Sequence, residues 1–316
     1  MNPSLTHTAP TSAGVRHGDG GAPSVALVAD DGRHLAATWH EPPAGAARAV
    51  AVMHAATGVP RGYYRAFAVW LAEQGYAVLT YDYRGIGGSR RRPIRDDRAS
   101  MRDWAVLDMS AAHAAADARR RAGTADELPL LLLGHSFGGN SLAFARGVEQ
   151  ADAILLVASQ IPVVHHFPGW RRWGAAFFFR AWVPLVTRLC GFLPAWANGG
   201  GEAVPREAAL QWCDWGTREA WAYSDPAMQP HRAVGAVVSP VHLWHVSDDL
   251  TYAPPGAVDA LAAQFRNASV QRHGVTPQEV GQQRLGHFGA FRREPGAQLW
   301  QRLLAPIEAA TPRLRR

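Results

Sequence analysis

The sequence predicts an α/β fold with a mainly parallel sheet, and three observations lead to that prediction. Short continuous apolar runs recur along the chain, and segments with helical spacing of apolar side chains separate them. Continuous apolar runs indicate strands that are buried on both faces of a sheet. Strands that alternate with helices in this way usually build a parallel sheet. The chain has 316 residues, 47% of them hydrophobic and 18% charged, which is enough to bury a sizeable core.

The expected strands and helices can be assigned in order along the chain. Two runs that flank the turn Asp30-Asp31-Gly32 predict a hairpin, and six further apolar runs predict more strands. The eight expected strands cover residues 24–29, 34–39, 49–53, 77–81, 128–133, 153–158, 241–246 and 268–272. Helical spacing and stop signals such as Gly75 predict helices between them. The expected helices cover residues 64–73, 103–121, 141–148, 256–265 and 296–310.

The alternation breaks between residues 160 and 229, where no strand-like run occurs. Seven of the twelve tryptophans lie in this segment, and such clusters generally pack, because each ring buries a large apolar area. Its position between two strands of a regular sheet predicts an inserted helical lid, residues 160–229, on a core of residues 24–159 and 230–316. Residues 1–23 are rich in Pro, Gly, Thr and Ala without periodicity and predict a flexible tail.

Composition and charge argue against several other classes of protein. The net charge of +6 comes from scattered arginines with only two short runs, at residues 90–92 and 119–121, so no nucleic-acid interface is expected. Cys190 and Cys213 have neither disulfide-framework nor metal-ligand spacing and predict free thiols in a reducing compartment. The N-terminus lacks the pattern of a signal peptide, so we expect a cytoplasmic protein.

One apolar stretch, residues 177–196, approaches the length of a membrane span. Arg180, Pro184 and Arg188 interrupt it, and each arginine would be costly near the centre of a bilayer. We therefore expect a buried or lid-like helical segment rather than a span, and leave shallow contact with a lipid surface as an open alternative. The oligomeric state stays open as well.

The segment Gly134-His135-Ser136-Phe137-Gly138 matches G-x-S-x-G. The match alone is weak evidence, but an expected strand runs directly into it and a helix is expected after it. A sharp strand-to-helix turn exposes the serine hydroxyl at the top of the sheet, and the glycines let neighbouring backbone approach closely. The helix N-terminus also favours a developing oxyanion. We therefore predict Ser136 as a nucleophile, with an idle serine in a glycine-rich turn as the alternative.

A serine hydroxyl is a poor nucleophile at neutral pH and needs a base, which a carboxylate orients. In folds with this turn the chain order is serine, acid, histidine. Asp248 and Asp249 follow the expected strand 241–246 and are both candidates for the acid. His287 lies in a glycine-flanked loop before the last expected helix and is predicted as the base, whereas His273 lies in or beside a strand and is interpreted as structural.

Two backbone N–H groups are needed to stabilise the oxyanion. One is expected from Phe137, directly after the nucleophile, and the other from the loop of residues 54–58 after the third strand. His54 is interpreted as a structural residue that holds this loop. Asp82 and Arg84, after the fourth expected strand, are interpreted as a salt bridge within a turn that takes no part in the chemistry.

Together these residues resemble the α/β-hydrolase superfamily from about residue 24 to the end, and more narrowly bacterial hydrolases of its serine aminopeptidase and monoglyceride-lipase-like branch. The shared features are residues 54–56, Asp82-x-Arg84-Gly85-x-Gly87-x-Ser89, residues 134–138, Asp249, residues 286–288, Pro168-Gly169-Trp170 and Trp212-Cys213-Asp214-Trp215. The resemblance implies an eight-stranded hydrolase sheet with helices on both faces, Asp249 as the acid, nine residues after Pro240, and Ala56 as the second oxyanion donor. Ala55 departs from the pattern, because glycine is common there.

The sequence therefore predicts a serine hydrolase that cleaves a carboxylic ester or a related acyl bond through Ser136, His287, Asp249 and an acyl-enzyme. This chemistry needs no metal and no cofactor. The tryptophan-rich lid predicts a small-molecule substrate with an apolar acyl group. Two alternatives stay open: an acyltransferase with the same triad, and a non-catalytic binding protein on the same fold.

Overall fold

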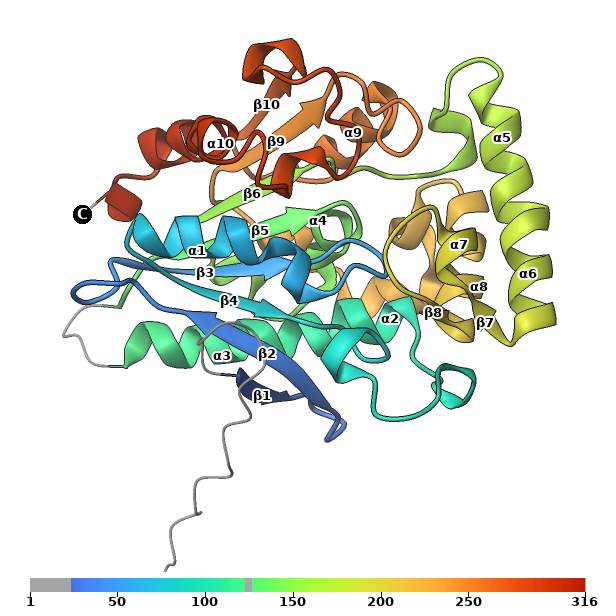
Figure 1. Cartoon of the computed structure of the whole chain (residues 1–316), viewed down its shortest axis with the longest axis horizontal. Coiled ribbons are helices and arrows are strands. Elements are labelled where there is room, and N and C mark those ends of the chain that lie inside the picture. The colour runs from blue at the N-terminus through green and yellow to red at the C-terminus, as the bar shows by residue number, and fades with distance from the viewer. Residues whose placement is uncertain (1–23, 123–126, 316) are drawn as a thin grey trace, which may run out of the picture.

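The computed structural model describes residues 24–122 and 127–315, which are built around an eight-stranded sheet (Figure 1). The strand order is β1-β2-β4-β3-β5-β6-β9-β10, and only the pairings β1–β2 and β2–β4 are antiparallel. The strands are β1 (Ser24–Val28), β2 (His34–His40), β3 (Ala49–His54), β4 (Tyr76–Tyr81), β5 (Leu130–His135), β6 (Ala153–Val157), β9 (Val241–Val246) and β10 (Val270–Val275). The predicted fold class and the first hairpin are confirmed. The tail predicted for residues 1–23 lies outside the described residues.

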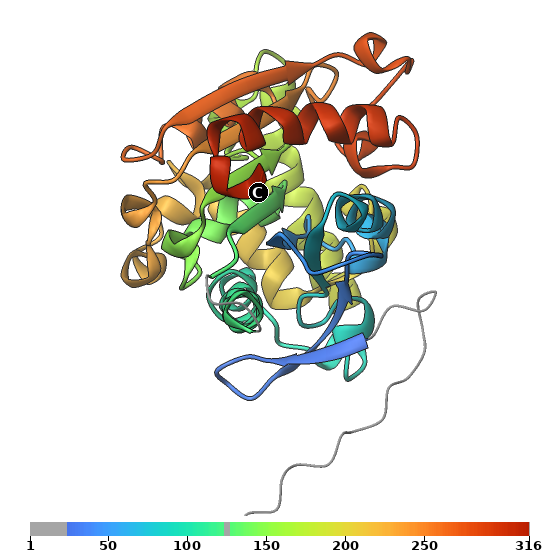
Figure 2. The ribbon, with the colours of Figure 1, turned by 90° about the vertical axis from the view of Figure 1, so that its left-hand side faces the viewer.

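Helices cover both faces of this sheet. The helices of the core are α1 (Arg65–Glu73), α2 (Met101–Asp103), α3 (Met109–Arg121), α4 (Phe137–Ser141), α9 (Pro255–Ala262) and α10 (Ala297–Ala310). Helices α1 and α10 lie on one face of the sheet and α3 on the other (Figures 1 and 2). A π-helical turn, Trp104–Asp108, joins α2 to α3. Ser100 begins this long helix with a capping box, because its side chain and that of Asp103 each accept the other residue's backbone N–H.

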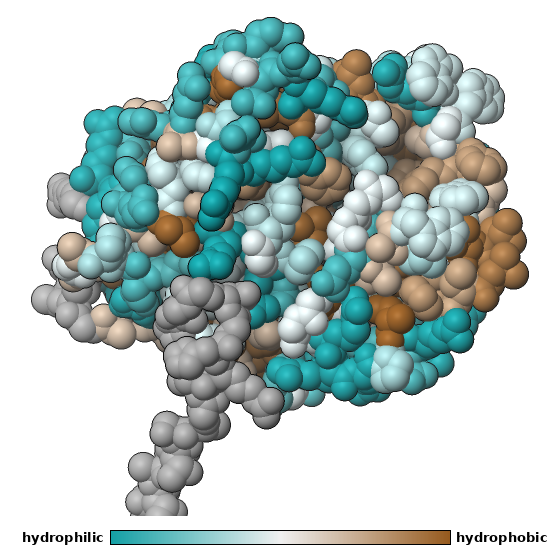
Figure 3. Space-filling view, viewed as in Figure 1, coloured by the Kyte–Doolittle hydropathy of each residue, from teal (hydrophilic) through white to brown (hydrophobic). Residues whose placement is uncertain are grey.

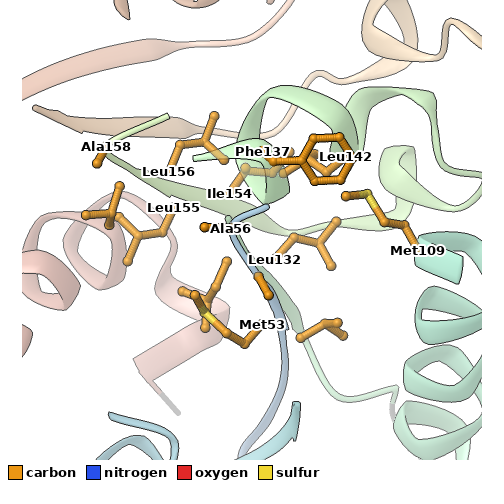
Figure 4. Packing of buried hydrophobic residues seen from close by; sticks show 14 of the residues in the cluster. Met53, Ala56, Met109, Leu132, Phe137, Leu142, Ile154, Leu155, Leu156 and Ala158 are labelled. Carbon is orange, nitrogen blue, oxygen red and sulfur yellow. The ribbon is translucent and has the colours of Figure 1, made fainter. Parts of the chain in front are cut away.

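The central strands hold the hydrophobic core. Leu130, Leu131, Leu132 and Leu133 of β5 are almost completely buried, as expected for a strand that is covered on both faces. Figure 4 shows Leu132 in one cluster of buried side chains with residues of β3, β6 and α4. This packed centre makes β5 a rigid support for the residues that follow its carboxyl end.

The helix predicted over residues 141–148 is wrong. Helix α4 begins at Phe137, directly after the nucleophile turn as expected, but it ends at Ser141 and only the 3₁₀ turn Leu142–Phe144 follows. Ala145 has an extended backbone, and Gly147, with a φ of 84°, precedes a separate 3₁₀ turn, Val148–Gln150. The start at Phe137 matters for the site, because it places the N-terminus of α4 directly behind Ser136.

The segment between β6 and β9 lies at the carboxyl ends of the parallel strands (Figure 1). Its elements are α5 (Arg171–Phe177), α6 (Val183–Cys190), β7 (Phe192–Leu193), α7 (Ala195–Asn198), β8 (Val204–Pro205) and α8 (Arg206–Thr217). A π-helical turn joins α5 to α6 just before Pro184, whose missing N–H interrupts the regular helical hydrogen bonds. The short strands β7 and β8 pair with each other, so the segment is not free of strands as predicted. The prediction missed them because strands of two residues leave no sequence pattern.

The predicted salt bridge between Asp82 and Arg84 is wrong. Asp82 forms its ion pair with Arg61, which precedes α1. Arg84 instead pairs with Asp108 at 2.7 Å and with Asp31 at 2.6 Å. The two side chains therefore connect this loop to separate elements of the fold. Asp82 and Arg84 are close in sequence, but they do not form an ion pair with each other.

Two histidines form a buried hydrogen-bonded pair beneath β3. The Nδ1–H of His113 donates to the carbonyl oxygen of Arg146 at 2.8 Å, so its Nε2 accepts from the Nε2–H of His54 at 3.1 Å. The Nδ1 of His54 then accepts from the Tyr81 hydroxyl at 2.7 Å. Burial lowers the pKa of His113 to about 4 and the pKa of His54 well below its ordinary value. Both rings are therefore neutral in the folded protein.

We expect the buried pair to make stability fall between pH 6.5 and pH 5. Below about pH 6.5 the unfolded chain binds a proton at His113, whereas the folded chain resists it until about pH 4. The stability contributed by neutral His113 is therefore complete above pH 6.5 and declines as the pH falls, by about 2 kcal/mol at pH 5. Urea unfolding at both pH values measures the loss. His113→Asn keeps a donor for Arg146 and should lose about 2 kcal/mol less than wild type over that interval; equal losses in both proteins would contradict the prediction.

Candidate active site

Ser136 lies in the turn between β5 and α4, with a backbone φ of 53° and ψ of −117°. A positive φ is rare for a residue with a side chain, and such strain is concentrated at functional sites. The turn is also tightly packed. A Cβ atom at Gly138 would lie 2.1 Å from the carbonyl oxygen of His54, and one at Gly134 would lie 2.4 Å from the Cα atom of Gly139. Both glycines are therefore required for the turn to form.

The structure places Asp249 and His287 in direct contact. The Nδ1–H of His287 donates to Asp249 Oδ2 at 2.5 Å, and both side chains are buried. The other carboxylate oxygen of Asp249 accepts the backbone N–H of Tyr252 at 3.2 Å. The ring of Tyr252 stacks on that of His287, with the ring centroids 4.8 Å apart. The carboxylate keeps the proton on Nδ1, so that Nε2 is available as a base. The stacked ring of Tyr252 limits rotation of the imidazole.

The neighbouring carboxylate, Asp248, has a different position and different partners. It accepts the backbone N–H groups of Leu285 at 3.0 Å and Gly286 at 2.9 Å. These hydrogen bonds hold the loop that carries His287. Of the two acids that the sequence left as candidates, only Asp249 is hydrogen-bonded to the histidine ring among the described residues.

Ser136 and His287 line the same cavity, which has a volume of about 300 Å³ and lies between the sheet and the segment that follows β6. Within the described residues no hydrogen bond joins the two side chains directly. Nine of the 22 described lining residues are aromatic. The aromatic lining residues are Phe137, Phe167, Trp170, Phe178, Phe179, Trp212, Trp221, Tyr252 and Phe288. The described lining residues include no aspartate or glutamate. Among these residues, Arg171 alone carries a permanent charge.

The two predicted oxyanion donors differ in their availability. Phe137 is the first residue of α4, so its N–H has no partner within the helix, and the residue lines the cavity. The N–H of Ala56 instead donates to the Tyr64 hydroxyl at 2.9 Å. This departs from the expectation of a free donor at Ala56. Ala56 and its neighbour Thr57 both line the cavity, so this loop borders the position of a bound carbonyl group.

A buried tyrosine–histidine pair, which no sequence pattern predicted, connects the three loops of the site. The Nε2–H of His135 donates to the carbonyl oxygen of His287 at 2.9 Å, so Nδ1 of His135 accepts from the Tyr64 hydroxyl at 2.8 Å. Tyr64 also accepts the N–H of Ala56, as described above. Burial lowers the pKa of His135 well below its ordinary value, so the ring is neutral. The pair therefore ties the oxyanion loop and the base loop to the residue before the nucleophile.

Other candidate residues lie away from this cavity. His273 in β10 stacks on Trp244 and shares a hydrogen bond of 3.0 Å with His242, as expected of a structural residue. Cys190 and Cys213 are both free thiols. Across residues 24–122 and 127–315, no three His, Cys, Asp or Glu side chains are grouped as a metal ion would require. In the same residues no helix has the length and apolar character needed to cross a membrane.

The chain matches a known protein family over most of its length. The sequence pattern of the family described as "Serine aminopeptidase, S33" matches residues 45–271, which is well over half of the chain. The chain belongs to this family. It is accordingly a hydrolase of the α/β-hydrolase superfamily. No curated protein matches the sequence.

Several solved structures share the family's fold at low sequence identity. A soluble variant of monoglyceride lipase from Saccharomyces cerevisiae is 14% identical with a TM-score of 0.63, over 96% of this chain and 99% of that one. The esterase Pf2001 of Pyrococcus furiosus is 13% identical with a TM-score of 0.54, over 91% and 92% of the two chains. A puromycin-hydrolyzing peptidase of Mycobacterium tuberculosis is 18% identical with a TM-score of 0.53, over 92% of this chain and 39% of that one. The similarity supports the fold, and the substrates of these proteins differ.

Proposed function

We propose that this protein is a serine hydrolase that cleaves carboxylic esters of small molecules with an apolar acyl group. One observation carries the proposal: the hydrogen-bonded pair of Asp249 and His287 borders the same aromatic cavity as the strained nucleophile turn at Ser136. A base that is oriented by a buried carboxylate, beside a serine at a helix N-terminus, is the arrangement that acyl transfer requires.

The proposed reaction has two steps. Nε2 of His287 takes the proton from the Ser136 hydroxyl, whose oxygen attacks the ester carbonyl carbon. The N–H of Phe137 stabilises the oxyanion at the N-terminus of α4, and Asp249 stabilises the imidazolium. The imidazolium then protonates the leaving alcohol as the carbon–oxygen bond breaks. Water, deprotonated by His287, attacks the acyl-enzyme, and the carboxylic acid leaves as the proton returns to Ser136.

The charge of the cavity favours an ester over an aminopeptidase substrate, although the family description names the latter activity. An aminopeptidase must bind the α-ammonium group of its substrate, and a carboxylate is the usual partner for a buried cation. The described lining residues include no carboxylate, and Arg171 at the cavity would repel an ammonium group. The aromatic walls fit an apolar acyl chain instead.

A panel of p-nitrophenyl esters of increasing acyl length tests this proposal. We expect kcat/KM to rise at least about tenfold from acetyl to hexanoyl, because each buried methylene contributes about 0.8 kcal/mol. The p-nitroanilides of alanine and leucine should be cleaved far more slowly than the hexanoyl ester. A preference for acetyl or for charged acyl groups, or faster cleavage of the aminoacyl anilides, would count against the proposal.

A further inference from the structure

The outer side of the helix formed by α5, its π-helical turn and α6, residues 171–190, exposes large apolar side chains to solvent. Nine large hydrophobic residues are exposed in the described chain, and six of them lie on or beside this helix. These six are Trp170, Trp173, Phe177, Leu185, Leu189 and Trp196. The other three are valines on separate elements. Exposed apolar side chains that gather in one place usually mark an interaction site.

The spacing of these residues forms two neighbouring pairs along the helix, one before and one after the π-helical turn. Trp173 and Phe177 are four residues apart, as are Leu185 and Leu189, and residues four apart are neighbours on a helix surface. Figure 3 shows brown and pale side chains over the edge of the molecule where α5 and α6 lie. Trp173 and Leu189, near the two ends of the helix, are each 77% exposed. We call Trp173, Phe177, Leu185 and Leu189 the apolar stripe.

The charged side chains on the helix itself are all positive, whereas Asp214 and Glu219 lie on and just after the neighbouring helix α8. Residues 171–190 contain Arg171, Arg172, Arg180 and Arg188 and no aspartate or glutamate. None of these four arginines forms an ion pair with another described residue. An apolar helix face with exposed tryptophan and a cationic margin has the composition of helices that lie in the interface of anionic membranes.

We propose that the apolar stripe docks onto an anionic lipid surface. The charge pattern disfavours a second copy of the chain as the occupant, because a two-fold contact through this helix would bring the four arginines of one copy against those of the other, and the helix carries no acidic residue of its own. An anionic lipid surface pairs with the arginines while the acyl region takes up the aromatic rings.

The helix that carries the apolar stripe also forms part of the wall of the active-site cavity. Four residues at the start of the same helix and just before it line the cavity that contains Ser136: Trp170, Arg171, Gly174 and Ala175. Docking would therefore place the cavity beside the lipid surface, from which an acyl substrate could enter without crossing water. This last step rests on the proposed esterase function, whereas the docking itself does not.

Sedimentation with lipid vesicles tests the docking directly. The full chain is mixed with vesicles of phosphatidylcholine alone or with about 30% phosphatidylglycerol, and the bound fraction is measured. We expect binding to the anionic vesicles that weakens in high salt, because screening removes the electrostatic part. Trp173→Ser/Phe177→Ser should lower the partition coefficient at least about tenfold. Arg180→Gln/Arg188→Gln should lower it about fivefold per arginine on anionic vesicles only.

Val69→Ser/Val238→Ser is the matched control, because both valines are exposed apolar residues on other elements. It should bind vesicles like the wild type, and all variants should keep wild-type melting temperatures, since the changed side chains are at the surface. Absence of wild-type binding, or equal binding by the stripe variant, would overturn the proposal. A dimer in sedimentation velocity that the stripe variant loses would overturn it in favour of a second copy.

Fluorophosphonate labelling of Ser136 in the absence of vesicles separates the two proposals. Labelled protein that does not bind vesicles would reject the docking and keep the hydrolase. Unlabelled protein that binds them would reject the hydrolase and keep the docking.

Discussion

Replacement of Ser136 by alanine is expected to abolish covalent labelling by a fluorophosphonate probe and to lower the kcat of ester hydrolysis by about 10⁴-fold or more. The probe and the ester both react at the serine oxygen, which the variant lacks. Alanine tolerates a φ of 53° about as well as serine does, so the turn between β5 and α4 should be kept. Gel fluorescence after labelling and a hexanoyl ester assay measure the two effects.

Ser141→Ala is the matched control for this variant. Ser141 is also a buried serine of the same turn-and-helix unit, but its hydroxyl donates to Asn140 Oδ1 and it does not line the cavity. It should be labelled like the wild type. Equal labelling of Ser136→Ala and wild type would show that another residue is the nucleophile.

The core of the fold could be predicted because its strands are short and buried on both faces. The leucines of β5 and the apolar run of β3 leave a sequence pattern that few other structures produce. The glycines around Ser136 were equally informative, because a tight turn allows no side chain at Gly134 or Gly138. Backbone requirements of this kind are local, so the sequence expresses them locally.

Contacts between distant segments could not be predicted in the same way. Tyr64 has helical spacing with its neighbours, and nothing in that pattern indicates that its hydroxyl meets Ala56 and His135. The prediction that Asp82 pairs with Arg84 was wrong for the same reason, because the tertiary fold brings a different partner to each of these side chains. Chain order and the family resemblance predicted the contact of Asp249 with His287. Only the structure shows that Asp249 contacts the histidine ring whereas Asp248 holds the loop that carries it.

Replacement of Asp249 by asparagine is expected to lower kcat for ester hydrolysis by about 10⁴-fold at neutral pH while leaving the fold intact. The backbone N–H of Tyr252 donates to Asp249 Oδ1, so the amide oxygen of asparagine should occupy that position. The amide NH₂ would then face Nδ1 of His287, in place of the carboxylate oxygen that now lies 2.5 Å away. Nδ1 would have to accept rather than donate, which moves the ring proton to Nε2 and leaves no base toward Ser136.

Asp248→Asn provides the comparison that makes this prediction specific. Its carboxylate accepts two backbone N–H groups, from Leu285 and Gly286, and an amide oxygen can keep at least one of them. The loop that carries His287 should loosen slightly, so kcat should fall about tenfold or less, because the tautomer of His287 is unchanged. Steady-state kinetics on the hexanoyl ester give both values. Similar losses in the two variants would mean that the acids act only by holding the loop, and the proposed role of Asp249 would be wrong.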